Sequence, residues 1–153
     1  MDKGRSAKPL KSAVLDASIL VKIVLPEKNE ENVREALLLF ERFANQKLTI
    51  TLPSFWNYEV GNTLVRKLST GLFEEKFAFL LSQPFEIYSF SKTENVTIGK
   101  FAKLHYVSFY DASYHLLAYF TDSLFITADK KYFGQFKKDK HIILLGSLKT
   151  RSS

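Results

Sequence analysis

The sequence predicts an α/β protein built around a parallel β-sheet. Short apolar segments suited to buried strands recur about every 35 residues, and segments whose apolar residues have helical spacing lie between them. This alternation is typical of parallel sheets, because a helix usually forms the crossover between two parallel strands. With 153 residues, of which 46% are hydrophobic, the chain is long enough for one domain with a substantial core.

Strands and helices are expected to alternate along the whole chain. The strands cover residues 13–16, 48–52, 86–90, 124–127 and 141–145. The helices cover residues 18–25, 29–44, 53–70, 73–82, 92–105 and 108–120. No internal repeat or low-complexity segment interrupts them. We therefore expect a flexible basic tail over residues 1–11, a single domain over residues 12–148 and a C-terminal tail over residues 149–153.

Local signals define several helix ends. Glu30 and Glu31 are expected in the first turn of the second helix, where the helix dipole favours acidic residues. Gly71 is expected to end the third helix. Ser91 and Ser108 are each followed three residues later by an acid, and this capping-box spacing predicts the starts of the fifth and sixth helices.

The composition excludes several classes of protein. No apolar run approaches the roughly 18 residues that a membrane span requires. The polar, basic start lacks the apolar segment of a secretory signal, so we expect a cytoplasmic protein without membrane contact. The absence of cysteine excludes disulfides and thiolate metal sites.

Four carboxylates are expected at one edge of the sheet. They are Asp16 at the end of the first strand, Glu59 in the helix after the second strand, Asp111 in the first turn of the helix before the fourth strand, and Asp129 just beyond the fourth strand. Strand ends and helix starts meet at the carboxyl edge of a parallel sheet, where ligand sites form. Glu59 is expected roughly 8–9 Å below this edge, two turns or less into its helix.

Clustered carboxylates repel one another unless a cation holds them. An all-oxygen site suits Mg²⁺ or Mn²⁺, and either ion can activate water and neutralise a phosphodiester transition state. Each acid also has a structural alternative. Asp16 and Asp129 are placed to cap the segments after them, and Asp111 is the distal member of a capping box. Singly, the structural role is the commoner one for each acid, but convergence at one edge favours a metal site.

Four segments carry these acids. They are Val14-Leu15-Asp16-Ala17-Ser18, Pro53-Ser54-Phe55-Trp56-Asn57-Tyr58-Glu59-Val60-Gly61-Asn62, Phe109-Tyr110-Asp111-Ala112-Ser113-Tyr114 and Ile126-Thr127-Ala128-Asp129-Lys130. In their order and spacing, over about residues 13–145, they resemble the PIN domain, and within it the VapC-type toxins of toxin–antitoxin pairs.

The resemblance implies a three-layer α/β/α fold with a five-stranded parallel sheet, and Mg²⁺- or Mn²⁺-dependent cleavage of RNA. It also implies a small VapB-type antitoxin, whose C-terminal segment covers the site, and a toxin homodimer. By position, the principal metal ligands of the family correspond to Asp16 and Asp111, the other two acids to Glu59 and Asp129, and supporting polar residues to Thr127 and Ser18.

Other functions remain open from the residues alone. A phosphatase or receiver-type domain also uses a strand-end Asp with Mg²⁺, but the phosphatase pattern needs a second Asp where Ser18 stands. An NTPase is disfavoured because no Gly-rich phosphate loop ending in Lys-Ser/Thr occurs. A housekeeping PIN nuclease of RNA processing and a non-catalytic RNA- or protein-binding module are the alternatives that remain.

The charge balance favours a polyanionic partner. The formal charge is +6, and if four of the 16 acids share one pocket, 12 acids face 22 basic residues elsewhere. Phosphate-binding candidates by proximity to the motifs are Lys22, Arg66, Lys67, Lys130 and Lys131, although a solvated role is equally common for each. Candidates for base stacking are Tyr106, Phe109 and Tyr110, whereas Phe40, Phe77, Phe101 and His115 are better explained as structural residues.

Overall fold

The computed structural model describes residues 9–25, 27 and 30–150, with residues 149 and 150 described for their backbone only. A five-stranded sheet runs through the molecule in the order β3-β2-β1-β4-β5, and every neighbouring pair is parallel. The strands are β1 (Ser12–Leu15), β2 (Thr49–Pro53), β3 (Glu86–Tyr88), β4 (Leu124–Thr127) and β5 (Ile142–Leu144). The predicted α/β fold with a five-stranded parallel sheet is therefore confirmed.

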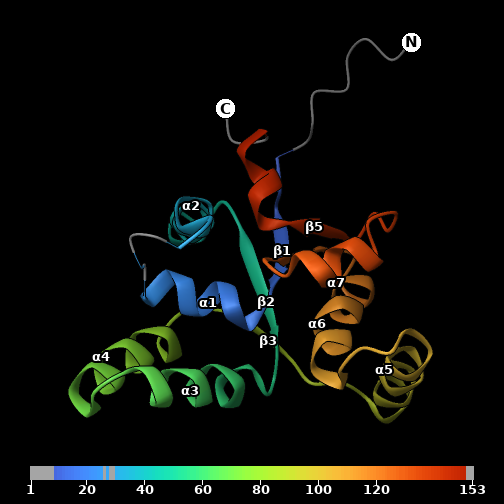
Figure 1. Cartoon of the computed structure of the whole chain (residues 1–153), viewed down its shortest axis with the longest axis horizontal. Helices are drawn as coiled ribbons and strands as arrows, with labels where there is room; N and C mark the ends of the chain where they lie inside the picture. Colours follow the sequence, from blue (N-terminus) through green and yellow to red (C-terminus); the bar gives the residue numbers. More distant parts are fainter. Residues whose placement is uncertain (1–8, 26, 28–29, 151–153) are drawn as a thin grey trace.

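Helices cover both faces of this sheet. In order they are α1 (Ala17–Val24), α2 (Val33–Ala44), α3 (Trp56–Lys67), α4 (Thr70–Leu81), α5 (Lys92–His105), α6 (Phe109–Phe120) and α7 (Lys130–Gln135), followed by the 3₁₀ helix η1 (Leu145–Thr150). Figure 1 shows α1 to α4 on one side of the sheet and α5, α6 and α7 on the other. The fold thus has the three layers that the resemblance implied.

The strand order places a switch point beside β1. From β1 the chain moves outward to β2 and β3, and then crosses back to β4 and β5 on the opposite side of β1. In parallel sheets the crevice at such a reversal, beyond the carboxyl ends of the strands, is where ligands bind. Asp16 follows β1 and Asp129 follows β4, so both acids flank this crevice.

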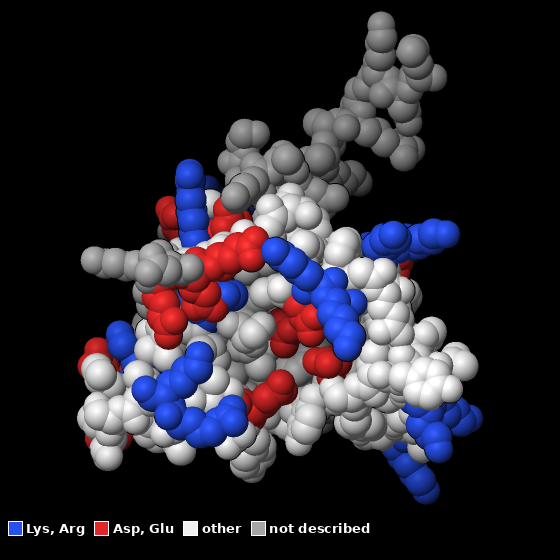
Figure 2. Space-filling model, in the orientation of Figure 1, with Lys and Arg blue, Asp and Glu red and all other residues white. Residues whose placement is uncertain are grey.

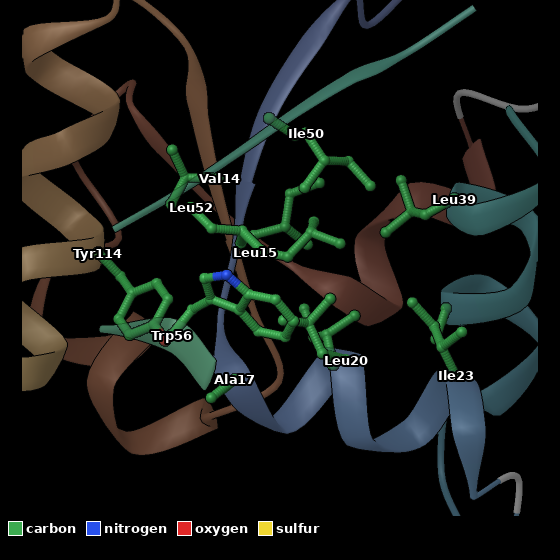
Figure 3. Close-up of a cluster of buried hydrophobic side chains, with 14 of the residues drawn as sticks. Val14, Leu15, Ala17, Leu20, Ile23, Leu39, Ile50, Leu52, Trp56 and Tyr114 are labelled. Atoms are coloured by element: carbon green, nitrogen blue, oxygen red, sulfur yellow. The ribbon is translucent and has the colours of Figure 1, made fainter. Parts of the chain in front are cut away.

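The main core packs the sheet against α1 to α3 on one face and against residues of α6 and α7 on the other. Figure 3 shows side chains from several elements pointing into one cluster, including Leu15, Leu20, Leu39, Ile50 and Trp56. Each of these side chains is at most 5% exposed. A smaller cluster between α5 and α6 anchors the other helical layer. The aromatic residues predicted to be structural, namely Phe40, Phe77 and Phe101, pack against these clusters.

The second helix begins later than predicted. Asn32 has a left-handed backbone (φ 64°), so α2 starts only at Val33, and the predicted start at Asn29 lies outside the described residues. Glu30 and Glu31 therefore precede the helix instead of forming its first turn. A short polar side chain makes Asn tolerant of this conformation, which the helical periodicity of the sequence does not reveal.

Other elements also differ from the prediction. Pro53 continues β2, where it pairs with Tyr88, so α3 starts at Trp56 rather than at residue 53. The break between α3 and α4 falls at Leu68 and Ser69, and Gly71 lies inside α4 instead of ending a helix. Both α7 and η1 were not predicted, because segments of six residues carry too little periodicity.

The predicted N-terminal tail lies outside the described residues up to residue 8, and the C-terminal tail does so from residue 151. No helix in the described part of the chain combines the length and hydropathy that crossing a membrane requires.

Gly61 allows α3 and α4 to pack closely. A Cβ atom at Gly61 would lie 3.1 Å from Cζ of Phe77, whereas one at Gly99 in α5 would meet nothing within 4 Å. We expect Gly61→Val to lower the free energy of unfolding by about 1–3 kcal/mol through overpacking. Gly99→Ala should raise it by about 0.5–1 kcal/mol, because Ala favours the helix. Urea unfolding measures both, and a Gly61→Val protein as stable as the parent would refute the close packing.

Candidate metal centre at the carboxyl edge of the sheet

The carboxylate of Asp16 is hydrogen-bonded to strand β4. Asp16 occupies the N-cap position of α1, yet its side chain makes no capping hydrogen bond. Its backbone N–H donates to the carbonyl of Ile126 (3.1 Å), and the hydroxyl of Thr127 donates to Oδ2 of its carboxylate (3.1 Å). A helix cap alone therefore does not account for the position of this side chain.

Thr127 connects Asp16 to Asp129. Its side chain is 1% exposed, and its hydroxyl oxygen also accepts a hydrogen bond from the backbone N–H of Asp129 (3.0 Å). Asp129 itself does cap α7, because its Oδ1 accepts the backbone N–H of Tyr132 (2.9 Å). Asp129 is exposed, and the cap occupies one of its two carboxylate oxygens.

Asp111 lies in the first turn of α6, half-buried. Its backbone N–H donates to the hydroxyl oxygen of Ser108 (3.0 Å). The Ser91 capping box is complete, with the side chain of Glu94 reaching back to the Ser91 backbone, but the Ser108 box forms only its first half. The carboxylate of Asp111 is consequently not committed to the backbone of Ser108.

Glu59 is closer to the edge than predicted. Because α3 starts at Trp56, Glu59 lies in its first turn, roughly 5 Å from the start at about 1.5 Å per residue. Its Oε2 atom is buried and has no hydrogen-bond partner among the residues that the structure describes. Burying a carboxylate oxygen without a hydrogen bond costs free energy, so binding a cation or a proton at this atom would be favourable.

The four acids influence one another electrostatically. Burial and the nearby charge of Asp111 raise the pKa of Asp16 to about 6. Burial, followed by the charges of Asp16 and Asp111, raises the pKa of Glu59 to about 7. Burial also raises the pKa of Asp111, as does Asp129. We call these four side chains the acidic cluster. Figure 2 shows acidic side chains in a hollow at the middle of this face, with lysine and arginine side chains around it.

The donor set of the acidic cluster fits a hard cation. Its atoms are carboxylate oxygens, one of them without a partner, and the mutual repulsion would be relieved by positive charge. Among the described residues, no three Asp, Glu or His side chains are already arranged as a metal-ligand set. Binding an ion would therefore require the carboxylates to draw together around it.

The supporting residues of the prediction differ in position. Thr127 is hydrogen-bonded to the Asp16 carboxylate, as described above. Ser18 is exposed in the first turn of α1. The backbone of Ser18 and the side chain of Thr127 both act to lower the pKa of Asp16, but burial raises this pKa by more.

Tyr114 is a member of this site that the sequence analysis missed. Its ring is fully buried, and its hydroxyl, like Oε2 of Glu59, has no partner in hydrogen-bond geometry within the described part of the chain. The Tyr114 hydroxyl and the Glu59 carboxylate are nevertheless close enough to interact. The hydroxyl acts to lower the pKa of Glu59, and the carboxylate acts to raise the pKa of Tyr114. Burial and the charge of Glu59 raise the pKa of the Tyr114 hydroxyl far above its usual value, so this group stays protonated. Residues three apart share a face of a helix, so Tyr114 lies on the face of α6 that carries Asp111.

A second buried tyrosine, Tyr132, has a different partner. Its hydroxyl lies 2.8 Å from Nδ1 of His115, and Nε2 of His115 lies 2.9 Å from Oδ2 of Asp139. Burial lowers the pKa of His115, so the ring is neutral. Nδ1 then accepts a hydrogen bond from the Tyr132 hydroxyl, and the N–H at Nε2 donates to Asp139. The structural role predicted for His115 fits this arrangement.

These two tyrosines should respond differently to loss of the hydroxyl. Tyr114→Phe removes a buried hydroxyl without a well-formed hydrogen bond and should leave the free energy of unfolding unchanged or raise it by up to about 1 kcal/mol. Tyr132→Phe leaves Nδ1 of His115 unpaired and should cost about 1–2 kcal/mol. Urea unfolding of both variants without added metal tests this contrast. Equal losses in the two variants would show that the Tyr114 hydroxyl is bonded in solution.

Two of the predicted phosphate-binding lysines are engaged elsewhere. Lys22 is buried and forms an ion pair with Glu30, so it is not free to bind phosphate. Lys130 is exposed and contacts both carboxylate oxygens of Glu31 at 3.0 Å. Arg66 and Lys67 are exposed in the last turn of α3, at the end away from Glu59. Lys131 is exposed beside Asp129.

Comparisons with known proteins agree with this architecture. The sequence profile of one family, the PIN domain, matches residues 13–138. No curated protein sequence matches the chain.

Three solved structures are similar in fold. VapBC2 from Rickettsia felis, bound to a DNA fragment from its promoter, has a TM-score of 0.59 and 18% identity, over 87% of this chain and 96% of that one. PAE2754 from Pyrobaculum aerophilum has a TM-score of 0.64 and 20% identity, over 92% and 94%. FitAcB from Neisseria gonorrhoeae has a TM-score of 0.64 and 15% identity, over 88% and 98%. At these identities the likeness establishes a shared fold.

Proposed function

This chain belongs to the PIN-domain family, whose members are in general nucleases, and on that premise we propose that it is a metal-dependent endoribonuclease. We propose further that it acts in the cytoplasm as the toxin of a VapBC-type pair. Support for the second step comes from the similar folds of VapBC2 and FitAcB. The partners we propose are an RNA substrate, a small VapB-type antitoxin and a second copy of this chain.

The acidic cluster is the observation that carries the proposal. RNA binding alone needs no buried carboxylates, and burying them next to one another is unfavourable, which is why the pKa values of Asp16 and Glu59 are raised. A fold that keeps such a cluster at its switch point is expected to use it for a cation. This argues against a non-catalytic binding module.

Each acid has an assigned role in this proposal. Asp16, which follows β1, and Asp111, in the first turn of α6, would hold Mg²⁺ or Mn²⁺. The ion, when bound, supplies a Lewis acid that makes water more acidic and offsets charge on the phosphodiester. Glu59 Oε2 forms no hydrogen bond with the described residues and is the atom we assign to orienting the attacking water. Thr127 keeps the Asp16 carboxylate turned toward β4, and Asp129 completes the acidic set beside it.

An RNA cleavage assay tests the proposal. The protein should cut RNA with Mg²⁺ or Mn²⁺, should stop with EDTA, and should lose the activity as Asp16→Asn. Cleavage that needs metal but persists in Asp16→Asn and Asp111→Asn would refute the site assignment. RNA binding without cleavage of any RNA would favour the binding module. Co-purification of a small DNA-binding protein encoded beside this chain would separate a toxin from a housekeeping nuclease.

A further inference from the structure

A chain of buried hydrogen bonds connects α6 with α7. It runs from the Tyr132 hydroxyl in α7 to Nδ1 of His115 in α6 (2.8 Å), and from Nε2 of His115 to Oδ2 of Asp139 (2.9 Å), in the loop after α7. His115 is fully buried and Tyr132 is 6% exposed, so water does not compete for the bond between them. We call Tyr132, His115 and Asp139 the α6–α7 brace.

The α6–α7 brace is attached to each helix close to an acid of the cluster. His115 lies four residues after Asp111, on the same face of α6. The backbone N–H of Tyr132 donates to Oδ1 of Asp129 (2.9 Å), while the side chain of Tyr132 bonds to His115. Tyr132 thus holds Asp129 through its backbone and α6 through its side chain. The brace therefore influences where the carboxylate of Asp129 lies relative to Asp111.

Asp139 gives the hydrogen bonds of the brace their direction. A neutral histidine ring has one nitrogen that donates and one that accepts. The carboxylate of Asp139 accepts from Nε2 of His115, so the proton stays on that nitrogen and Nδ1 is left as the acceptor. Burial, followed by the charge of Asp111, raises the pKa of the Tyr132 hydroxyl, so this group keeps the proton with which it bonds to Nδ1.

The other end of the brace is fixed to the start of β5. Oδ1 of Asp139 accepts a hydrogen bond from the backbone N–H of His141 (2.8 Å), one residue before β5 begins. Oδ2 of Asp139 also accepts the hydroxyl of Tyr119, from the last turn of α6. Asp139 is therefore held independently of Tyr132, and it can hold the His115 ring in one orientation.

The short helix α7 needs side-chain attachments of this kind. With six residues, it is too short to be stable by itself. Apolar contacts, such as that between Tyr132 and Phe136 (centroids 4.8 Å), hold it against the core without fixing one direction, as a hydrogen bond does. A buried hydrogen bond adds little net stability over an apolar pair of the same shape. The position that the brace gives to α7 therefore explains it better than stability does.

We propose that the α6–α7 brace positions the acidic cluster, because it holds the carboxylate of Asp129 within reach of a divalent cation bound by Asp16 and Asp111. The inference rests on the proposed function, since it concerns the ligands of the same site. Groups that hydrogen-bond to metal ligands set the orientation of those ligands and thereby the affinity for the ion. Asp139 is then a positioning residue that acts through His115 and Tyr132 and touches neither the ion nor RNA.

Titration of the full chain with Mn²⁺, in the absence of RNA, tests the proposal. The electron paramagnetic resonance signal of the free ion measures how much Mn²⁺ is bound. Tyr132→Phe removes the hydroxyl and keeps the ring, and it should weaken Mn²⁺ binding about tenfold. Asp139→Ala leaves Nε2 of His115 without its acceptor, so it should weaken Mn²⁺ binding in the same direction by a smaller factor.

Two control variants separate positioning from stability. Tyr119→Phe removes a hydroxyl that bonds to the same oxygen of Asp139 but lies outside the chain of bonds to Asp129. Ile23→Val shortens a buried side chain at the end of α1 away from Asp16, and it should lower the urea midpoint of unfolding. Both variants should bind Mn²⁺ as tightly as the parent protein.

Amide hydrogen exchange adds a measurement that needs no metal. In EDTA, the N–H of residue 132, which donates to Asp129, should exchange about fivefold faster in Tyr132→Phe and Asp139→Ala than in the parent. Equal exchange rates would overturn the proposal, as would Mn²⁺ affinities equal to that of a parent that binds the ion. An equal loss of affinity in Ile23→Val would also overturn it, because reduced stability would then explain the effect.

Failure of the proposed function gives a different result. Faster exchange at residue 132 in a chain that binds no Mn²⁺ would support the positioning of Asp129 and count only against the metal centre. Weaker Mn²⁺ binding by Tyr132→Phe, in a chain that cleaves no RNA, would support the brace and count only against the nuclease function.

Discussion

Asp111→Asn is expected to reduce metal-dependent RNA cleavage by at least about a hundredfold. The substitution keeps the shape of the side chain but removes the charge that we assign to holding the ion. The fold should survive, because the bond between residue 111 and Ser108 uses the backbone N–H, which remains. Initial rates at saturating Mn²⁺ measure the effect, and circular dichroism establishes that the variant is folded.

Asp122→Asn is the matched control for this substitution. Asp122 is exposed in the turn between α6 and β4, and its left-handed backbone (φ 48°) is one that Asn also adopts readily. The RNA cleavage rate of the Asp122→Asn variant should equal that of the parent protein. A tenfold or smaller reduction for Asp111→Asn, or an equal reduction for Asp122→Asn, would show that Asp111 is not a ligand.

Asp16→Asn is expected to stabilise the protein in the absence of metal. The pKa of Asp16 is raised from 3.8 to about 6, so the folded chain holds this proton more tightly than the unfolded chain does. Above that pH the ionised carboxylate destabilises the fold by roughly 1–3 kcal/mol, because each tenfold difference in proton affinity between the two states is worth about 1.4 kcal/mol. The advantage of the Asp16→Asn variant over the parent should therefore be absent at pH 3.8, grow as the pH rises, and be complete above about pH 6.

Added Mn²⁺ should reverse this order. A cation that binds only the folded parent stabilises it by mass action, and Asp16→Asn should lose most of that gain. Urea unfolding at about pH 4 and about pH 7.5, with EDTA and with Mn²⁺, measures both effects. A variant less stable than the parent in EDTA at the higher pH, or one stabilised by Mn²⁺ as much as the parent, would contradict the account.

The sequence was sufficient for the sheet and for the place of the acids. Asp16 and Asp129 follow the apolar strands β1 and β4, and parallel strands bring their carboxyl ends to one edge whatever the details of the loops. The predicted helix boundaries were wrong where the backbone conformation of a single residue set the start of the helix. Asn32 adopts a left-handed conformation, and Pro53 remains in a strand, so α2 and α3 both begin late.

The missed parts of the site depend on tertiary contacts. Tyr114 lies in an apolar helical pattern, so the sequence shows a core residue, and only the fold reveals that its hydroxyl lies beside the acids without a hydrogen-bond partner. The ion pair between Lys22 and Glu30 also depends on the path of the chain after α1. The three-residue spacing from Asp111 was the one signal that pointed to Tyr114.

Anomalous X-ray scattering from crystals grown with Mn²⁺ tests the central claim most directly. The account predicts a Mn²⁺ ion within the acidic cluster, with carboxylate oxygens of Asp16 and Asp111 at about 2.0–2.3 Å. The same crystals of Asp16→Asn should lack that peak or show it strongly reduced. An ordered Mn²⁺ ion bound elsewhere, with Asp16 and Asp111 making no contact to it, would contradict the assignment of this edge as a metal centre.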